Sequence, residues 1–82
     1  MATAAVADRV VFPKRAGERV EIWAELYRGE CFVHARVYHL VDGEEWRPTR
    51  KGLSLRAELT EQVAEAMLSA ARGELNGSAE PA

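Results

Sequence analysis

The stretch that decides the fold is Val20-Glu-Ile-Trp-Ala-Glu-Leu-Tyr27, in which aliphatic residues alternate strictly with acidic or aromatic ones. In an extended chain one face carries the aliphatic set, Val20, Ile22, Ala24 and Leu26. The other face carries Glu21, Trp23, Glu25 and Tyr27. A period of two over this length predicts a half-buried antiparallel strand.

A second strand is predicted directly after the first. Arg28-Gly29-Glu30 has the composition of a short turn, in which Gly29 is free to adopt a positive φ. Residues 32–41 follow and are rich in β-branched and aromatic side chains, which favour strands. The two segments therefore predict a hairpin, and residues 10–12 predict a further short strand before Pro13.

Further turn and strand signals follow the hairpin. Asp42-Gly43 is typical of a turn. The strand that begins after it at Glu44 meets Pro48, which predicts an interruption or an edge position because proline lacks an N–H group. Extended alternation resumes over residues 52–55, so we expect β structure up to Leu55.

The last third of the chain changes its period. Apolar residues recur there at helical spacing, at Leu59, Val63, Ala66, Met67 and Ala70. A second apolar group is expected roughly opposite, at Ala64, Leu68, Ala71 and Leu75. Exposed leucines are common on proteins, but so short a chain has little core and favours a partner helix. The predicted dimer interface comprises Val63, Met67, Leu68 and Ala71, and Gly73 is expected to cap the helix.

Composition narrows the class of protein. The 82 residues are 48% hydrophobic and 29% charged, with a formal net charge of −2, which excludes a fully disordered, collagen-like or coiled-coil chain. The total charge does not suggest a strongly basic nucleic-acid binder. The single Cys31 excludes an internal disulfide framework. With no signal peptide or membrane span in view, we expect a soluble intracellular protein.

Catalytic candidates are few. Cys31 and His34 could form a nucleophile and its base, but period two places them on opposite faces. Cys31 and His39 share a face but lie too far apart along a strand for a hydrogen bond. These residues supply too few ligands for a metal site. The sequence therefore predicts no enzyme, no metal, no cofactor and no small-molecule substrate, with Cys31 acting as a small hydrophobic residue.

Basic and aromatic residues gather in the middle of the chain. Trp46-Arg-Pro-Thr-Arg-Lys-Gly52 places Arg47, Arg50 and Lys51 beside a ring with no acid among them. On the predicted strands, Arg36 shares a face with four rings, Trp23, Tyr27, Phe32 and Tyr38. Rings and guanidinium groups on an open sheet suit single-stranded nucleic acid. Two other interpretations stay open: a merely solvated charged face, and rings packed as a second small core.

A glycine-started strand carries Arg36 and Tyr38, and after a loop the motif Pro48-x-Arg50-Lys51-Gly52-Leu53-Ser54-Leu55 leads into a helix. With these residues the central region resembles the positive cofactor four family of transcriptional coactivators, which are small single-stranded-DNA-binding domains. The resemblance implies an α+β fold in which a strongly curved four-stranded antiparallel sheet is followed by one C-terminal helix. It also implies dimerisation through that helix and channels that hold unpaired strands.

The resemblance also implies the binding residues. By position these are Tyr27, Arg28, Arg36, Arg47, Arg50, Lys51 and Gly52. His39 stands where family members often carry a stacking tryptophan, and a bulge is needed to bring it to a strand of nucleic acid. Trp46 is expected to supply a replacement ring. Glu25 and Glu30 occupy positions that are basic in better-known members, a second departure from the family.

The expected function is therefore that of a homodimeric binder of single-stranded or melted DNA, of the transcription-coactivator type, with low sequence specificity. Two alternatives stay open: RNA as the ligand, and a protein-interaction module that grips a peptide or a polymerase subunit of the transcription machinery. We expect a binding domain over residues 10–73 between flexible tails, 1–9 and 74–82. The expected location is the cytoplasm, on the nucleoid, in a bacterium, or the nucleus in a eukaryote.

Overall fold

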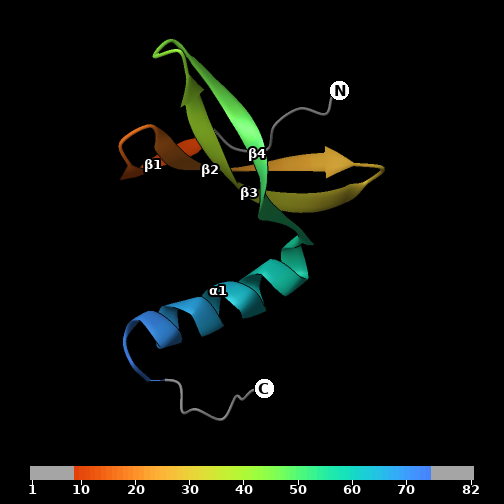
Figure 1. The fold of residues 1–82 in the computed structure, drawn as a ribbon. Coiled ribbons are helices and arrows are strands. Elements are labelled where there is room, and N and C mark those ends of the chain that lie inside the picture. The colour runs from red at the N-terminus through yellow and green to blue at the C-terminus, as the bar shows by residue number, and fades with distance from the viewer. Residues whose placement is uncertain (1–8, 75–82) are drawn as a thin grey trace.

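The computed structural model describes residues 9–74, which form one sheet and one helix (Figure 1). The elements in chain order are β1 (Val10–Arg15), β2 (Glu18–Tyr27), β3 (Glu30–Val41), β4 (Glu45–Arg56) and α1 (Ala57–Ala71). The four strands are antiparallel and lie side by side in the order β1-β2-β3-β4. This confirms the predicted α+β class and the curved four-stranded sheet followed by a C-terminal helix. Apart from Arg9 and Glu74, the predicted tails lie outside the described residues.

The two central turns owe their geometry to pairs of residues with positive φ. Arg28 and Gly29 have φ values of 54° and 81°, and Asp42 and Gly43 have values of 57° and 69°. Consecutive left-handed residues twist in the sense that matches the right-handed twist of the joined strands. Both predicted turns are thereby confirmed.

The observed strands are longer than the predicted ones. β1 continues through Pro13 to Arg15, and β4 runs from Glu45 to Arg56 without a break at Pro48. β4 is an edge strand, so one of its sides makes no ladder hydrogen bonds and tolerates proline. The edge position expected for Pro48 is confirmed, and the interruption is not observed.

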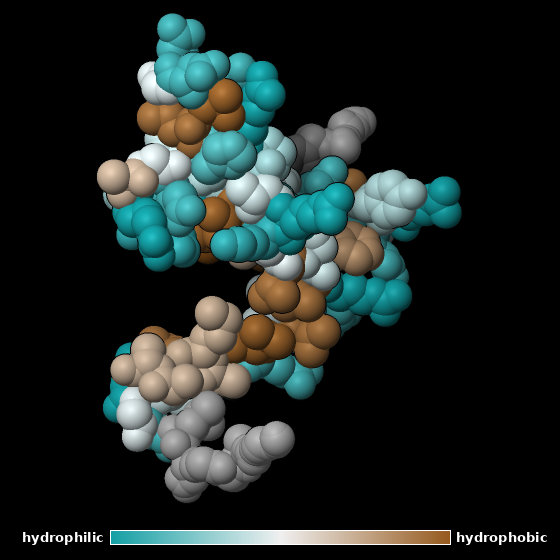
Figure 2. Space-filling view, viewed as in Figure 1, coloured by the Kyte–Doolittle hydropathy of each residue, from teal (hydrophilic) through white to brown (hydrophobic). Residues whose placement is uncertain are grey.

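Helix α1 lies against the aliphatic face of the sheet but leaves a gap of about 280 Å³ between them. The gap is lined by Ile22, Val33, Ala35, Leu53, Leu55, Thr60, Val63, Ala64 and Met67. Figure 2 shows hydrophobic side chains at the surface where the sheet and the helix meet. No apolar residue of the described chain is buried, and Met67 and Leu68 are 63% and 50% exposed. A single chain therefore has no sealed core within the described residues.

The lining of the gap corrects one expectation. The second apolar group, which includes Ala64, was expected roughly opposite Val63 and Met67, but in the structure all three residues line the same gap. At about 100° per residue Ala64 is only about 60° from Met67 around the helix, so that expectation was wrong. The apolar side of α1 is thus one broad surface rather than two separate stripes.

Gly73 has a φ of 73° just after the helix, which confirms the predicted cap. Leu75 lies outside the described residues. No helix of the described residues 9–74 has the length and apolarity that crossing a membrane requires.

Candidate nucleic-acid interface

The face of the sheet opposite α1 carries the rings. We call it the aromatic face, and its β2 and β3 residues are Arg19, Glu21, Trp23, Glu25, Tyr27, Glu30, Phe32, His34, Arg36, Tyr38 and Leu40, as the strand register and the period of two require. Trp23 stacks on His34 with ring centroids 5.1 Å apart and meets Tyr38 edge-on at 6.5 Å. Tyr27 and Phe32 form a second edge-on pair at 6.4 Å. The rings do not pack under α1, because α1 lies on the other side of the sheet.

Two arginines that the sequence reasoning did not single out lie over the two tryptophans. The guanidinium carbon of Arg9 is 3.9 Å from the ring centroid of Trp23, and that of Arg19 is 4.2 Å from the centroid of Trp46. Arg9 also donates a hydrogen bond to the Tyr38 hydroxyl at 3.2 Å. Alternation could have placed Arg19 on this face, since it is two residues before Glu21. No sequence signal pointed to Arg9, which lies in the predicted tail.

Glu21 joins these two arginines. It is 3% exposed, and its two carboxylate oxygens each accept a hydrogen bond of 2.8 Å, one from Arg9 and one from Arg19. Burial alone raises the pKa of this carboxyl, but the two charged donors outweigh it and hold the pKa below its ordinary value. Glu21 therefore helps to hold both cations over the rings.

Replacing Glu21 by glutamine is expected to reduce the free energy of unfolding by about 2 kcal/mol at neutral pH, because two charge-assisted hydrogen bonds are weakened. The folded-state pKa is depressed, so the stabilisation is present above the unfolded-state pKa and is lost as the pH falls through the folded-state value. Thermal unfolding near pH 7 and near pH 3 measures this. The difference between wild type and Glu21→Gln should narrow in acid, whereas Glu44→Gln in the exposed β3–β4 turn should match wild type at both pH values. An equal difference at both pH values would contradict the assignment.

A bulge in β4 brings the Arg-Lys pair beside Arg36. Arg36 pairs with Gly52 and Tyr38 pairs with Pro48, so residues 49–51 of β4 stand opposite Val37 alone. Thr49 holds the bulge: its hydroxyl donates to the Val37 carbonyl at 2.8 Å and accepts from the backbone N–H of Lys51 at 3.1 Å. The Thr49 carbonyl in turn accepts a hydrogen bond of 3.1 Å from the Arg36 guanidinium.

The bulge expected to turn His39 outward is not in β3. The β2–β3 register runs without a shift from Glu18 opposite His39 to Tyr27 opposite Glu30. His39 therefore lies on the same side of the sheet as Val37, which is the side opposite the aromatic face. Its side chain is exposed there. The bulge formed in β4 instead because the two extra residues belong to that strand. Trp46, by contrast, lies under Arg19 of the aromatic face.

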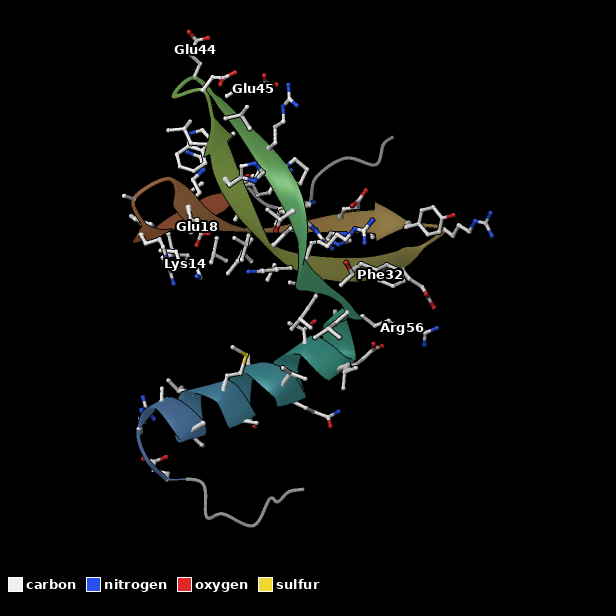
Figure 3. The ribbon with its side chains drawn as sticks, in the orientation of Figure 1. Lys14, Glu18, Phe32, Glu44, Glu45 and Arg56 are labelled. Atoms are coloured by element: carbon white, nitrogen blue, oxygen red, sulfur yellow. The ribbon has the colours of Figure 1, made fainter. Side chains whose placement is uncertain are left out.

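Two arginines of β4 are held in ion pairs. Arg47, a predicted binding residue, pairs at 3.2 Å with Glu45, which lies near the tip of the β3–β4 hairpin (Figure 3). Arg56, at the end of β4, pairs with Glu30 at 3.6 Å. Among the described residues, three others, Arg28, Arg36 and Arg50, have no carboxylate within ion-pair distance.

Lys51 also makes no direct ion pair within residues 9–74 but lies near one carboxylate. The hydrogen bond from Lys14 lowers the pKa of Glu18, and the charges of Arg15 and Lys51 add to that shift. Arg36 and Arg50 thus have no carboxylate partner at ion-pair distance among the described residues, whereas Lys51 lies near Glu18, which pairs with His39 on the side of the sheet opposite the aromatic face.

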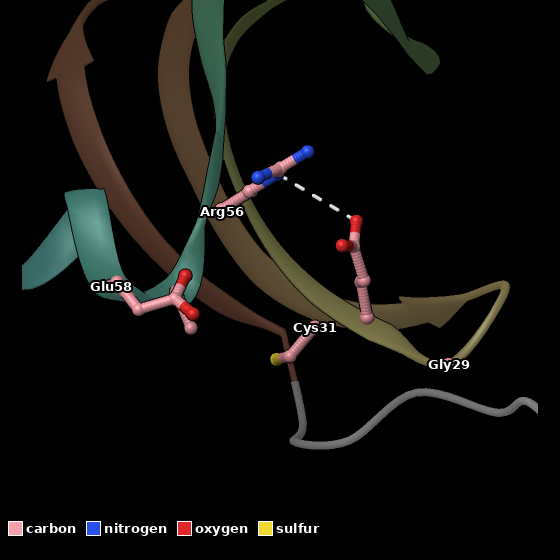
Figure 4. A pocket seen from close by; sticks show the side chains of 6 residues that line it. Gly29, Cys31, Arg56 and Glu58 are labelled. Carbon is pink, nitrogen blue, oxygen red and sulfur yellow. Dashed lines mark ion pairs between the residues drawn. The ribbon is translucent and has the colours of Figure 1, made fainter.

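Cys31 and His34 open onto different hollows. Cys31 lines a hollow of about 190 Å³ together with Gly29, Glu30, Arg56, Ala57 and Glu58 (Figure 4). His34 lines a pocket on the aromatic face instead. The prediction that these two side chains point apart is confirmed, so they do not form a nucleophile–base pair.

Solved structures of one bacterial protein share the fold of this chain and about a third of its aligned residues. A PC4 homologue from Burkholderia pseudomallei, in a tetragonal crystal form, matches with a TM-score of 0.67 and 31% identity over 85% of this chain and 98% of that one. Its orthorhombic form matches with a TM-score of 0.67 and 32% identity over 87% and 92% of the two chains.

A third solved structure is similar in fold. It is a bacteriophage T5 homologue of the eukaryotic transcription coactivator PC4, implicated in recombination-dependent DNA replication. It matches with a TM-score of 0.59 and 24% identity over 90% of this chain and 85% of that one. No protein-family model and no curated protein matches the chain.

Proposed function

This chain belongs to the PC4 family, and from that premise we propose that it is a homodimer that binds single-stranded or locally melted DNA in the regulation of transcription. The observation that carries the proposal is the aromatic face, where stacked rings share β2 and β3 with Arg36, next to the β4 bulge that carries Arg50. Among the described residues, Arg36 and Arg50 have no carboxylate partner that would compete with phosphate.

Phosphates and bases would use different parts of this face. Arg36, Arg50 and Lys51 would attract the backbone, while Arg47 would exchange its exposed partner Glu45 for a phosphate. Tyr27, which is 56% exposed, and Trp46 offer rings to unstacked bases. Stacking and charge act on every base, so the affinity would depend mainly on strand length and salt.

A second copy of the chain would complete the fold. The gap between α1 and the sheet is almost wholly apolar and open in one chain, and Met67 and Leu68 project from the same helix. So much exposed apolar surface on so short a chain favours an obligate partner. Pairing through α1 would cover that surface and leave the aromatic face of each copy free for DNA.

The experiment is a fluorescence-anisotropy titration of labelled oligo-dT over a range of salt concentrations. Wild-type binding should weaken linearly in log K against log salt, and the double variant Arg50→Ala/Lys51→Ala should flatten the slope by about 0.7 for each lost phosphate contact. Arg72→Ala, at the far end of α1, is the control and should leave the slope unchanged.

Three results would count against the proposal. An unchanged slope in the double variant would remove Arg50 and Lys51 from the interface. Tighter binding to an oligo-U RNA of the same length would make RNA the ligand. No binding to either strand would favour a protein partner for the same surface.

A further inference from the structure

A pocket on the aromatic face carries a carboxylate among rings. It has a volume of about 340 Å³ and is lined by Glu25, Tyr27, Phe32 and His34. That volume lies at the lower end of the range for small-molecule pockets. The edge-on rings of Tyr27 and Phe32 supply apolar walls, so a flat, partly polar molecule such as a nucleobase suits the pocket.

The histidine beside the carboxylate is itself fixed by two neighbours. His34 Nδ1 is 2.8 Å from the Ser54 hydroxyl, and Trp23 stacks on the same ring. Glu25 Oε1 lies 2.9 Å from His34 Nε2, but Nε2 is buried and has no hydrogen bond of good geometry within residues 9–74. Glu25 is otherwise without an ion pair in the described chain, and its side chain is 49% exposed. Oε1 thus faces the histidine, but each carboxylate oxygen can accept more than one hydrogen bond, and the half-exposed carboxylate is accessible to donors from a ligand.

The rim of the pocket carries two cations. The guanidinium of Arg28 lies 5.2 Å from the ring centroid of Tyr27, and Arg56 is the β4 residue opposite Phe32. Arg28 is placed to meet a phosphate that flanks a base in the pocket, and Arg56 would exchange its partner Glu30, 3.6 Å away, for a phosphate. They would offset the repulsion between the backbone and Glu25.

The two oxygens of a carboxylate discriminate strongly between bases, because a carboxylate only accepts hydrogen bonds. Guanine presents two neighbouring donors, N1–H and the 2-amino group, and so can bind both oxygens at once. Cytosine and adenine present one amino donor beside an acceptor nitrogen. Thymine presents a single N–H between two carbonyl oxygens, which a carboxylate repels.

We propose that Glu25 makes this pocket a base-reading site that favours guanine over thymine. The inference rests on the proposed binding of single strands by the aromatic face and adds a specificity to it. It also gives a role to an acidic residue at a position where the family resemblance leads one to expect a basic one.

The test uses a labelled oligo-dT strand that carries one central guanine, hypoxanthine, cytosine or adenine. Wild-type protein should bind the guanine strand roughly fivefold or more tightly than the all-thymine strand. Hypoxanthine lacks the 2-amino group and should recover only part of that gain. Glu25→Gln should lose the guanine preference and bind the all-thymine strand at least as tightly as wild type, because a negative charge is removed. Glu44→Gln, in the exposed β3–β4 turn, should keep the preference.

The outcomes separate the two proposals. If wild type binds all strands equally, or if Glu25→Gln retains the guanine preference, the base-reading site is wrong while single-strand binding stands. If wild type binds none of the strands, the proposed function fails and the base-reading site fails with it.

Discussion

Replacing Met67 with glutamate is expected to split the proposed dimer and to unfold most of the chain. Met67 lines the apolar gap between α1 and the sheet, where a partner copy would bury it. An unpaired charge buried there costs several kcal/mol, and the two-fold symmetry of a homodimer introduces it twice. Since no apolar residue is buried in the described part of one chain, a separated monomer has little to hold it folded. Light scattering and far-ultraviolet circular dichroism at the same concentration measure both effects.

The control introduces the same charge on the same helix. Gln62→Glu changes an exposed residue that does not line the apolar gap, so the dimer and the helical signal should both persist. A Met67→Glu protein that stays dimeric would refute pairing through α1. A Met67→Glu protein that is a stable folded monomer would instead refute the claim that the partner completes the core.

Gly52→Ala is expected to cause the second largest loss. A Cβ atom at position 52 would lie 2.5 Å from the carbonyl oxygen of Ala35 and 2.9 Å from the Cα of Arg36. Both atoms belong to the backbone of β3, so the strands must separate beside the bulge that carries Arg50. We expect a loss of about 3 kcal/mol in the free energy of unfolding and a fall of more than about 10 °C in Tm. Thermal unfolding measures it, and oligo-dT binding should weaken as well.

Gly17→Ala separates crowding from the general effect of replacing a glycine. Gly17 has a φ of 78°, and a Cβ atom at this position would meet no heavy atom within 4 Å beyond its chain neighbours. Alanine at this position should lower the free energy of unfolding only by the cost of a left-handed backbone conformation, about 1 kcal/mol. If Gly52→Ala were as stable as Gly17→Ala, the close approach of β3 and β4 would not be a constraint on this fold.

The elements that could be predicted from the sequence are those set by local physics. Strict alternation over residues 20–27 placed β2, the Arg28-Gly29 and Asp42-Gly43 pairs placed the turns, and Gly73 placed the end of α1. For Pro48 the edge position, one of the two predicted alternatives, is confirmed, because the loss of its N–H acts on its own strand. Each of these signals is contained within a few neighbouring residues.

What could not be predicted depends on pairing between distant residues. The bulge at residues 49–51 follows from the register of β4 against β3. Alternation of side chains along β3 alone suggested a bulge near His39, which is in the wrong strand. The Arg9–Glu21–Arg19 cluster joins residues on different strands and the end of a predicted tail. Among the proposed binding residues, the arginines stand out because they are dense in the sequence, whereas the pocket around Glu25 needed the β2–β3 register.

The central claim is that single-stranded DNA lies across the aromatic face. The chain has two tryptophans, and in the structure both Trp23 and Trp46 have an arginine of that face over their rings. Their indole N–H signals in a ¹⁵N-labelled sample therefore report on this face alone. On addition of unlabelled oligo-dT both indole signals should shift in proportion to saturation, while the amides of α1 stay in place. Binding that leaves both indole signals unmoved, or that shifts α1 instead, would contradict the account.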